Sequence, residues 1–493
     1  MPIDRRDVLK LGGSVLLAGG GAGLVSSCGS TEPAARPGAS RKADYTVRIA
    51  TGRVELAPGT VVSTTTYNGQ FPGPLLRLTE GRPVVVDIHN DTAIPELLHW
   101  HGQVVPAEVD GASEEGTPFI PAHGMRRQSF TPGPSGFRFY HTHVAALGDL
   151  NRSTYTGQVG PLYIEPKLDP GSYDQEVFLT LKEFDPSLSH GGDMAQDFLA
   201  GAEVPELKRR GEKAMADSLA RGMPHGYEVG YRVFSVNGRK LGHGEPVRVK
   251  SGQRVLFHVL NASATEIRSL ALPGHTFKVV ALDGNPVPRP ANVPVLWIGT
   301  AERVSALVEM DHPGVWVLGD LDDDDRKNGM GTVVEYAGRT GSARWTAPPK
   351  STWDYRTFAR AGATAQRPDR TMDLLVEKRN AADKGFNIWT LNGVPFSMDT
   401  NKPVIEVERG RRYRMRFRNA TDDIHPLHLH RHTFEVTHIA GTPTNGLRKD
   451  VVMLGGYQTL DFDFTADQPG LSLFHCHQQL HMDFGFMLLL HCA

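Results

Sequence analysis

The pattern of the stretch "YNGQFPGPLLRLTEGRPVVVDIHN" (Tyr67 to Asn90) occurs twice more in the chain, and this repetition predicts the fold. The other copies are "VNGRKLGHGEPVRVKSGQRVLFHVLN" (Val236 to Asn261) and "LNGVPFSMDTNKPVIEVERGRRYRMRFRN" (Leu391 to Asn419). Each copy opens with an Asn-Gly turn and closes with a Gly followed nine residues later by an Asn. Apolar residues alternate between that Gly and Asn, which is typical of a half-buried strand. The sequence therefore predicts one β-unit that is used three times.

A second element follows in each copy, and it supports the same count. Its sequences are "PSGFRFYHTH" (Pro134 to His143), "HPGVWVLGDL" (His312 to Leu321) and "QPGLSLFHCH" (Gln468 to His477). Copies spaced by about 160 residues indicate three β-sandwich domains in an all-β protein. We place these domains at residues 44–166, 172–340 and 365–493.

Two segments fall outside the repeat. Residues 194–221 have helix-forming composition, which predicts a helical insertion in the second domain, on the surface or over a site. Residues 341–364 are rich in turn-forming residues and are expected to link the second domain to the third. The 53 basic and 55 acidic residues nearly balance, so charge gives no indication of a nucleic-acid partner.

The first 28 residues resemble an export signal. An arginine pair, Arg5 and Arg6, precedes a weakly apolar run that is too short to span a bilayer, as in twin-arginine signals. The run ends in "VSSC", which resembles a lipoprotein cleavage box, so Cys28 is the expected lipidation site; cleavage elsewhere is the alternative. With residues 29–43 as a flexible linker, we expect an exported protein in the periplasm or on the outer face of the cell membrane, with a lipid anchor if Cys28 is acylated.

Four His-x-His pairs occupy matching positions of the first and third copies. Residues i and i+2 of a strand share a face, so each pair offers two imidazoles to one site. Eight imidazoles are too many for one ion and suit a cluster of several, which brings the first and third domains together. The second copy carries Leu270, Leu272, Gly319 and Leu321 at these positions. The pairs are His99 and His101, His141 and His143, His428 and His430, and His475 and His477.

The stretch "FHCHQQLHMDFGF" (Phe474 to Phe486) predicts a second metal site. If His475 and His477 face the cluster, Cys476 between them faces the other way. His425, an odd three residues before His428, can also point away, and His481 follows in the next loop. Two His and one Cys are the ligands of a blue-copper electron-transfer site. Phe486 is expected at the axial position as a residue that cannot coordinate, and Met487 is expected on the opposite face.

Other interpretations of these residues remain open. Zinc also binds His and Cys, but zinc sites take four ligands each and need no path for electrons. Asp110 is a candidate catalytic residue that orients a metal-bound water or passes protons, and the alternative is a turn-forming Asp-Gly pair.

The segments "HWHG", "HTH", "HPLHLH" and "HCHQQLH" match, in order and spacing, the copper signatures of the multicopper oxidases, and the chain resembles that family from about residue 44 onward. The resemblance implies three cupredoxin-like Greek-key domains and four copper ions: one type 1, one type 2 and two type 3. His425, Cys476 and His481 would hold the type 1 copper, and His99 and His428 the type 2 copper. The type 3 pair would be held by His101, His141, His143, His430, His475 and His477.

The resemblance also implies a laccase-like oxidase. It would take single electrons from a phenolic or aromatic donor, or from a metal ion, and reduce dioxygen to water. Met482 stands where several bacterial members carry a Glu thought to move protons, so Asp483 or Asp110 would do that work here. Alternatives are a cell-envelope cuprous oxidase, a copper nitrite reductase and a non-catalytic exported cupredoxin scaffold. A missing signature would favour the scaffold, but all ten histidines are present.

Overall fold

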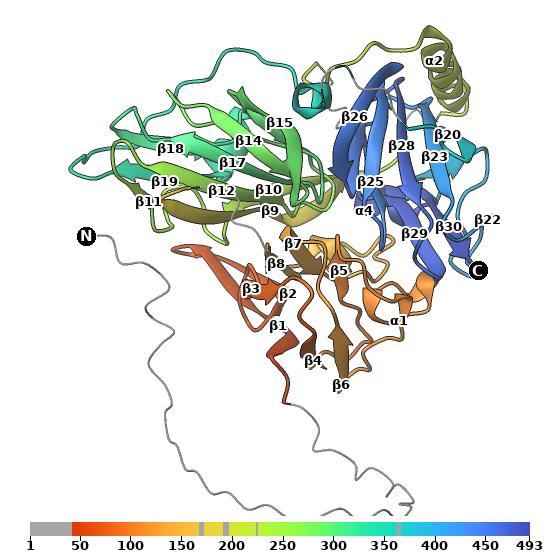
Figure 1. The fold of residues 1–493 in the computed structure, drawn as a ribbon, viewed down its shortest axis with the longest axis horizontal. Coiled ribbons are helices and arrows are strands. Elements are labelled where there is room, and N and C mark those ends of the chain that lie inside the picture. The colour runs from red at the N-terminus through yellow and green to blue at the C-terminus, as the bar shows by residue number, and fades with distance from the viewer. Residues whose placement is uncertain (1–41, 167–171, 191–196, 223–224, 361, 363–365) are drawn as a thin grey trace, which may run out of the picture. The chain divides into compact units, whose positions relative to one another are not determined.

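The three copies of the repeat fold into three similar groups of strands, coloured red to orange, yellow to green, and cyan to blue in Figure 1. The structure is a computed structural model that describes residues 42–166, 172–190, 197–222, 225–360, 362 and 366–493. Residues 43–493 form one unit. Most of the described elements are strands, so the predicted all-β class is confirmed.

The first domain consists of two four-stranded sheets. One has the order β2 (Thr60–Tyr67), β1 (Tyr45–Ala57), β4 (Val84–Asn90), β6 (Gly124–Phe130). The other has the order β3 (Leu76–Thr79), β8 (Val159–Glu165), β7 (Gly136–His141), β5 (His99–His101). The second sheet carries both His-x-His segments of this domain.

The second domain consists of a six-stranded sheet and two smaller ones. The large sheet has the order β10 (Glu228–Val236), β9 (Gln175–Ser189), β12 (Arg254–Asn261), β17 (Arg303–Glu309), β14 (Phe277–Leu282), β15 (Asn285–Val293). The smaller sheets are β11 (Val247–Val249), β19 (Gly331–Tyr336), β18 (Val315–Gly319), and β13 (Arg268–Leu270) with β16 (Leu296–Ile298).

The third domain consists of a six-stranded and a five-stranded sheet. The first has the order β21 (Phe386–Leu391), β20 (Arg370–Asp383), β23 (Arg412–Asn419), β28 (Thr459–Thr465), β25 (Phe434–Ile439), β26 (Thr442–Lys449). The second has the order β22 (Val404–Val407), β30 (Met487–Cys492), β29 (Gly470–Cys476), β24 (His425–Leu429), β27 (Val451–Leu454). The His-x-His segments of this domain lie on or directly after β24 and β29.

The Asn-Gly pair that opens each copy makes the same turn in all three domains. Both residues have positive φ, for example 55° at Asn68 and 70° at Gly69, which is the requirement of a tight hairpin turn and the reason for Asn-Gly. The first strand of each domain also pairs in parallel with the strand that ends each copy: β1 with β4, β9 with β12, and β20 with β23. The repeat in the sequence is therefore a repeat of topology.

The Asn that closes each copy fastens the loop that follows its strand. Asn419 Nδ2 donates to the carbonyls of Asp423 (2.8 Å) and Gly455 (3.0 Å), and its Oδ1 accepts from Thr421 N at 2.9 Å. Asn261 and Asn90 make equivalent bonds to their own loops. A buried Asn can satisfy several backbone groups at once, and here it fixes the loops that lead to the His-x-His segments.

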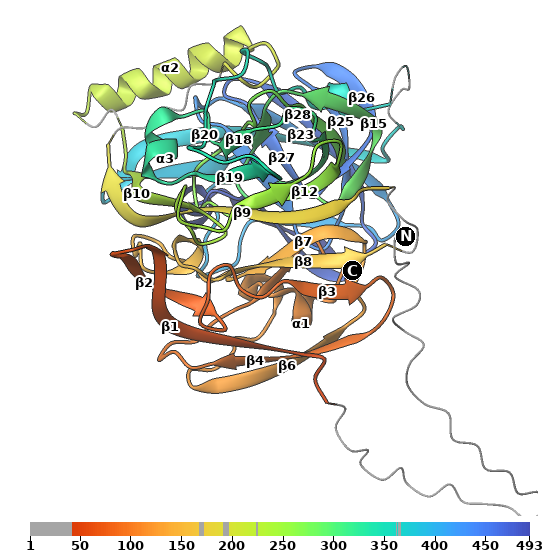
Figure 2. The same ribbon diagram turned by 90° about the vertical axis from the view of Figure 1, so that its left-hand side faces the viewer.

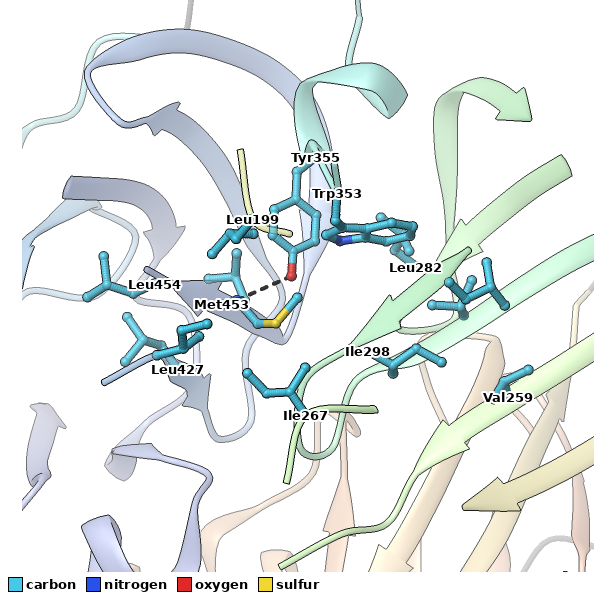
Figure 3. Close-up of a cluster of buried hydrophobic side chains, with 14 of the residues drawn as sticks. Leu199, Val259, Ile267, Leu282, Ile298, Trp353, Tyr355, Leu427, Met453 and Leu454 are labelled. Atoms are coloured by element: carbon cyan, nitrogen blue, oxygen red, sulfur yellow. Dashed lines mark hydrogen bonds between the residues drawn. The ribbon is translucent and has the colours of Figure 1, made fainter. Parts of the chain in front are cut away.

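The second and third domains share one hydrophobic core, and the segment between them is part of it. Figure 3 shows Trp353 and Tyr355 packed among apolar side chains of both domains, such as Leu282 and Leu427. Tyr355, in the 3-10 helix η3 (Tyr355–Phe358), accepts a hydrogen bond from Met453 N at 3.3 Å. Residues 353–359 therefore connect the second and third domains by packing in the core that both domains share.

Helices are few and short among the described residues. They are α1 (Ala107–Asp110), α2 (Pro205–Leu219), α3 (Asp323–Asn328) and α4 (Gln479–Asp483), with 3-10 turns η1 (Ser113–Glu115) and η2 (Ser153–Tyr155) in addition to η3. The predicted insertion appears as α2, which is mostly exposed and lies beside β20 of the third domain, as Figures 1 and 2 both show. Arg210 of α2 pairs with Glu377 of β20 at 2.6 Å. Within the described part of the chain, no helix has the length and apolarity needed to cross a membrane.

Candidate metal centre

Histidines from the first and third domains meet at the junction of β5, β7, β24 and β29. Within the first domain His99 lies opposite His141 on neighbouring strands, and within the third His428 lies opposite His475. Rings from the two domains stack on each other: the centroids of His101 and His428 are 3.9 Å apart. The predicted meeting of the first and third domains is therefore observed.

Three ligand atoms gather on one side of β29. His425 Nδ1 lies 3.1 Å from His481 Nδ1, and Cys476 Sγ lies 3.5 Å from each of these nitrogens. The far nitrogen of His425 is held by Thr421 Oγ1 at 2.9 Å. All three ligand side chains are buried, and strand alternation places Cys476 on the opposite face from His475 and His477, as the sequence predicts.

Aromatic side chains surround this trio. The Phe486 ring lies 4.8 Å from that of His425, while Met487 packs in a separate apolar cluster with Leu473 and Met482. The Trp389 ring lies 4.0 Å from that of His481, which is only 2% exposed. Phe486 thus faces the trio and cannot coordinate, whereas Met487 faces away.

The other eight histidines form three groups on the opposite side of β29, and the first two groups share His101. The ligand atoms of each group lie within 4.8 Å of one another. All eight are buried. The groups are His99, His101 and His428; His101, His141 and His477; and His143, His430 and His475.

Hydrogen bonds leave one nitrogen of most of these rings facing the centre of the cluster. His428 Nδ1 lies 2.7 Å from the Asp450 carbonyl oxygen and His141 Nδ1 lies 2.7 Å from that of Thr142, while the Nε2 of each ring has no partner among the described residues. His101 is reversed: its Nε2 lies 3.2 Å from Asp450 Oδ1 and its Nδ1 is left without a partner in the described part of the chain. Buried polar atoms are rarely left unpaired, and ligand histidines are usually held at their second nitrogen, so this donor set fits a cluster of metal ions.

Burial favours the neutral form of nine of the ten ligand histidines. It is the largest cause that lowers the pKa of every ligand histidine for which a shift is resolved, and it lowers that of His143 to about 3. Neutral imidazole is the form that binds metal ions. Burial also raises the pKa of the Cys476 thiol, so a cation is needed to hold the thiolate. The lowered values belong to His101, His141, His143, His425, His428, His430, His475, His477 and His481.

Of the two predicted catalytic carboxylates, only Asp110 contacts the cluster. Asp110 Oδ2 lies 2.8 Å from His430 Nδ1 and 3.0 Å from His99 Nδ1. Asp483 Oδ2 accepts hydrogen bonds from Ala146 N and Leu147 N, and the residue belongs to none of the ligand groups found in the described part of the chain. Burial raises the pKa of Asp483 to about 7.

Sequence reasoning missed a second carboxylate at the cluster, Glu115. Its Oε1 lies 3.4 Å from His430 Nδ1 and accepts a hydrogen bond from Leu473 N. Burial, followed by the charge of Asp110, raises the pKa of Glu115 well above its usual value. The available signal was a Glu five residues after Asp110 in a turn-rich segment, which is too weak to single out.

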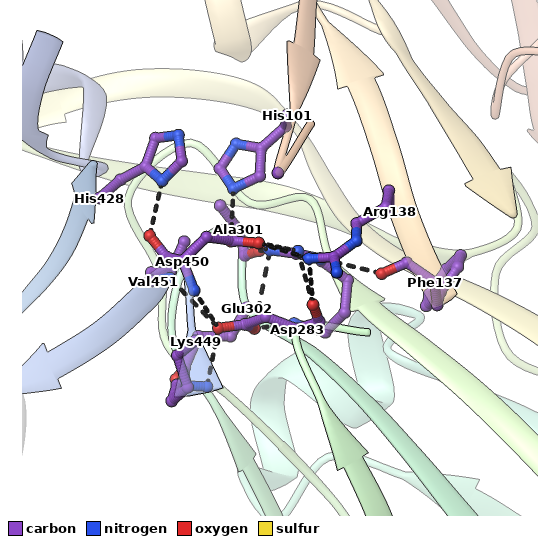
Figure 4. A network of polar contacts seen from close by, with 12 residues as sticks. His101, Phe137, Arg138, Asp283, Ala301, Glu302, His428, Lys449, Asp450 and Val451 are labelled. Atoms are coloured by element: carbon purple, nitrogen blue, oxygen red, sulfur yellow. Dashed lines mark hydrogen bonds and ion pairs between the residues drawn. The ribbon is translucent and has the colours of Figure 1, made fainter. Parts of the chain in front are cut away.

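Sequence reasoning also missed Asp450, whose carboxylate and carbonyl contact His101 and His428 (Figure 4). Two buried guanidinium groups hold this carboxylate, Arg138 at 2.8 Å and Arg303 at 2.6 Å. The only local signal in the sequence was Arg138, a charged residue between two Phe residues of a strand. The contact of Arg303 with Asp450 left no local signal, because these residues lie 147 residues apart.

Comparison with known proteins identifies the family. Three family models, each described as multicopper oxidase, match residues 48–169, 211–337 and 366–491. Together they cover well over half of the chain. The chain is a multicopper oxidase.

Relatives and solved structures agree with this assignment. The multicopper oxidase MmcO of Mycobacterium tuberculosis is 31% identical over 95% of this chain and 90% of its own length. Bilirubin oxidase of Albifimbria verrucaria is 26% identical over 85% of this chain and 71% of its own length. A multicopper oxidase of Pseudomonas thermotolerans superimposes with a TM-score of 0.66 at 24% identity, over 92% of this chain and all of that one, which supports the fold alone.

As a multicopper oxidase, the chain is a laccase-like oxidoreductase with three cupredoxin domains. Its family uses a reducing substrate and dioxygen. The predicted signal and Cys28 lie outside the described residues.

Proposed function

We propose that the protein oxidises a phenolic or aromatic donor, or a metal ion, one electron at a time and reduces dioxygen to water with four copper ions. The supporting observation is that the buried trio of His425, Cys476 and His481 lies on one side of β29 and the eight-histidine cluster on the other. Bound copper would supply the one-electron oxidation of the donor and the reduction of dioxygen.

We assign the trio to type 1 copper, with Phe486 as its non-coordinating axial neighbour. We assign His99 and His428 to type 2 copper and the other six histidines to the type 3 pair. His475, Cys476 and His477 are consecutive, so the backbone of one strand supplies a covalent path between the two sites. An apolar axial neighbour disfavours the more charged cupric state, so this type 1 site is expected to have a high reduction potential.

The carboxylates at the cluster have separate proposed roles. The Asp110 carboxylate is hydrogen-bonded to His430 Nδ1, while its backbone carbonyl is hydrogen-bonded to His99 Nδ1, and the carboxylate is placed to exchange protons with water at the cluster. Asp483 remains a second candidate for proton transfer, since its pKa of about 7 suits that role. The rates of oxygen uptake by Asp110→Asn and by Asp483→Asn should distinguish the two residues, because only the variant that lacks the proton-transferring carboxylate should lose activity.

A cavity of about 320 Å³ between α2 and the third domain is a candidate position for a small organic donor. Met215 and Leu219 of α2 and Thr421 line it, and Thr421 is hydrogen-bonded to His425. Pockets of this size accept small aromatic molecules. If a phenolic donor binds there, Met215→Trp should raise its KM, while Lys213→Trp on the exposed face of α2 should not.

Replacement of Cys476 tests the central proposal. Cys476→Ser should abolish both the intense visible absorption of thiolate-bound copper and oxygen uptake with a phenolic donor. The matched control is Cys492→Ser, because Cys492 is also buried and free but donates only to the Ala466 carbonyl at 3.6 Å. Full activity of Cys476→Ser would refute the proposal.

Substrate comparisons test the alternatives. Faster turnover with copper(I) than with a substituted phenol would identify a cuprous oxidase. Reduction of nitrite without dioxygen uptake would identify a nitrite reductase, and absence of all copper from the purified protein would identify a scaffold.

We propose that residues 1–28 direct export to the periplasm or the outer face of the cell membrane, with a lipid anchor on Cys28. The arginine pair Arg5 and Arg6 and the sequence "VSSC" support this proposal. Cys28→Ala should release the protein from the membrane fraction. Mass spectrometry of the mature N-terminus would show cleavage at another site if the anchor is absent.

A further inference from the structure

We propose that Asp450, held by Arg138 of the first domain and Arg303 of the second, is a positioning residue for two cluster ligands. This would be the contribution of the copper-free second domain to the site. The inference rests on the proposed binding of copper by His101 and His428.

Asp450 contacts two ligand rings that belong to different domains. Its carbonyl oxygen lies 2.7 Å from His428 Nδ1, and its carboxylate Oδ1 lies 3.2 Å from His101 Nε2. The two rings stack with centroids 3.9 Å apart and planes 14° from parallel. Because each contact fixes one nitrogen, the other nitrogen of each ring is directed to the cluster. For His101 that nitrogen is Nδ1, so Asp450 selects which atom of this ring can bind copper.

Two guanidinium groups fix the Asp450 carboxylate itself, and Figure 4 labels one of them, Arg138. Arg303 approaches it with both terminal nitrogens, Nη1 to Oδ1 at 2.7 Å and Nη2 to Oδ2 at 2.6 Å. Arg138 Nη1 donates to Oδ2 at 2.8 Å. A two-pronged guanidinium contact fixes the plane of a carboxylate as well as its position. Residues of all three domains therefore meet at one carboxylate.

A second layer of charges supports these groups. Asp283 Oδ2 accepts a hydrogen bond from Asp450 N at 3.3 Å and forms an ion pair with Lys449 Nζ at 2.9 Å. Lys449 also pairs with Glu302 at 3.0 Å. The six side chains carry three positive and three negative charges and are at most 2% exposed. Asp283, Glu302 and Arg303 all come from the second domain, so that domain supplies half of the network.

The residue that follows His101 is shaped to admit this network. A Cβ at Gly102 would lie 2.6 Å from Asp450 Oδ2 and 2.9 Å from Arg303 Nη2, and Gly102 has a φ of +76°. Any side chain here would displace the carboxylate and strain the backbone. The glycine of "HWHG" is thus explained by the approach of Asp450 and Arg303.

Stability alone does not explain the network. Desolvation of buried ion pairs often cancels their attraction, and apolar side chains of similar volume can stabilise a fold as well or better. What an apolar replacement could not provide is a hydrogen-bond acceptor fixed against His101 Nε2. Orientation of the ligand rings is therefore the function that we assign to the network.

Copper retention in the loaded protein tests the inference. Arg303→Gln and Asp450→Asn should weaken the binding of cluster copper by about 10- to 100-fold, measured as copper retained during competition with a chelator. The electron paramagnetic resonance spectrum of type 2 copper should change. The visible absorption of thiolate-bound copper per chain should stay the same, because the trio of His425, Cys476 and His481 does not touch the network.

The matched control removes a buried guanidinium elsewhere. Arg268 is 1% exposed and pairs with Glu183 at 3.2 Å, and both residues belong to the second domain. Arg268→Gln should lower stability without loss of cluster copper. Arg303→Lys keeps the charge but loses the two-pronged contact, so its retention of copper should lie between those of Arg303→Gln and the unchanged protein.

Several results would overturn the inference. The first is that Arg303→Gln loses the thiolate-bound copper together with the cluster copper, as a generally unfolded protein would. The second is that Arg303→Gln and Arg268→Gln retain equal amounts of cluster copper. The double variant of Arg303→Gln and Asp450→Asn should be no worse than the single ones, so additive effects would also refute it. Failure of the proposed function would give a different result. The unchanged protein would then take up no oxygen, while Arg303→Gln and Asp450→Asn would still retain less copper than the unchanged protein.

Discussion

The second and third domains share a strand framework but use equivalent positions for opposite purposes. In the third domain, His428 and His430 belong to the eight-histidine cluster. In the second domain, Leu270 and Leu272 take their places, are 1% and 2% exposed, and belong to the hydrophobic core. The strand framework therefore only presents side chains at fixed places, and side-chain chemistry decides whether such a place becomes a binding site or part of the core.

The second domain has nevertheless kept a connection to the cluster. Arg303 is the first residue of β17 and Asp283 directly follows β14, and both reach Asp450 of the third domain. The copper-free copy therefore acts on the site through its interface and not through ligands. This division of roles is testable by substitutions in both domains and by acid.

Exchange of the side chains between the two domains should have the largest effect. The double variant His428→Leu, His430→Leu gives the third domain the residues of the second. This variant should lose cluster copper. Its rate of oxygen uptake should fall by more than about 100-fold, because loss of a residue that only supports a metal ligand already lowers activity by up to about that factor. Copper content per chain and oxygen consumption measure both effects.

The reverse exchange serves as the control. Leu270→His, Leu272→His should bind no additional copper, because the matching positions of the neighbouring element hold Gly319 and Leu321 in place of a second His pair. Each unpartnered buried imidazole should lower the free energy of unfolding by about 1–3 kcal/mol. Copper binding by this variant would contradict the division of roles.

Acid should destabilise the copper-free protein mainly through its ligand histidines. Their pKa values are lowered by burial, to about 3 at His143, whereas an unfolded histidine has a pKa of about 6.5. As pH falls below about 6.5 the unfolded chain takes up protons that the folded chain refuses, so stability is complete above this pH and is lost below it. The melting temperature of the copper-free protein should fall steadily from neutral pH downward.

Hydrogen exchange can locate this loss. The strands β24 and β29 should lose protection at acid pH before the strands of the second domain, which hold none of the ligand histidines. Equal loss of protection in both domains would show that the ligand histidines do not cause the acid instability.

The closing Asn residues should be equivalent for stability but not for metal binding. Asn261→Ala and Asn419→Ala each leave buried carbonyls unpaired, so each should cost about 1–3 kcal/mol in the free energy of unfolding. Only Asn419 supports Thr421, which is hydrogen-bonded to His425. Denaturant unfolding should therefore give similar losses, while the visible copper absorption should change only in Asn419→Ala.

The smallest effect concerns Phe486, whose proposed role depends on the presence of Cys476 in the third domain. Phe486→Met offers a weak axial ligand, which should lower the reduction potential of the type 1 site with little change in copper content. Met487→Leu is the control, because Met487 packs on the other face with Leu473. Redox titration of the visible absorption should show a shift for Phe486→Met alone.

The parts of this molecule that the sequence predicted depend on short-range patterns. Alternation along β29 is a local property, so the separation of Cys476 from His475 and His477 follows from the order of the residues alone. The three-domain β fold followed from the repeat and is confirmed. The helix α2 was expected from composition over residues 194–221 and is observed at Pro205–Leu219, where a Pro near the first position favours its start.

The parts that could not be predicted depend on distant residues. Leu473 and Glu115 are 358 residues apart, and Arg303 and Asp450 are 147 apart, yet each pair is in contact. No periodic pattern encodes such pairs, because they arise from how the domains are assembled. The docking of α2 on the third domain, through Arg210 and Glu377, belongs to the same class.

The shared position of both metal sites on β29 also has a consequence for biosynthesis. Domains fold in order as a chain leaves the ribosome, so the first domain can present His99 and His141 long before their partners exist. Neither the sulfur trio nor the full ring of imidazoles can close until residues 475–481 have been made. Metal insertion must therefore follow translation of this segment, and ions captured earlier would occupy only half of a site.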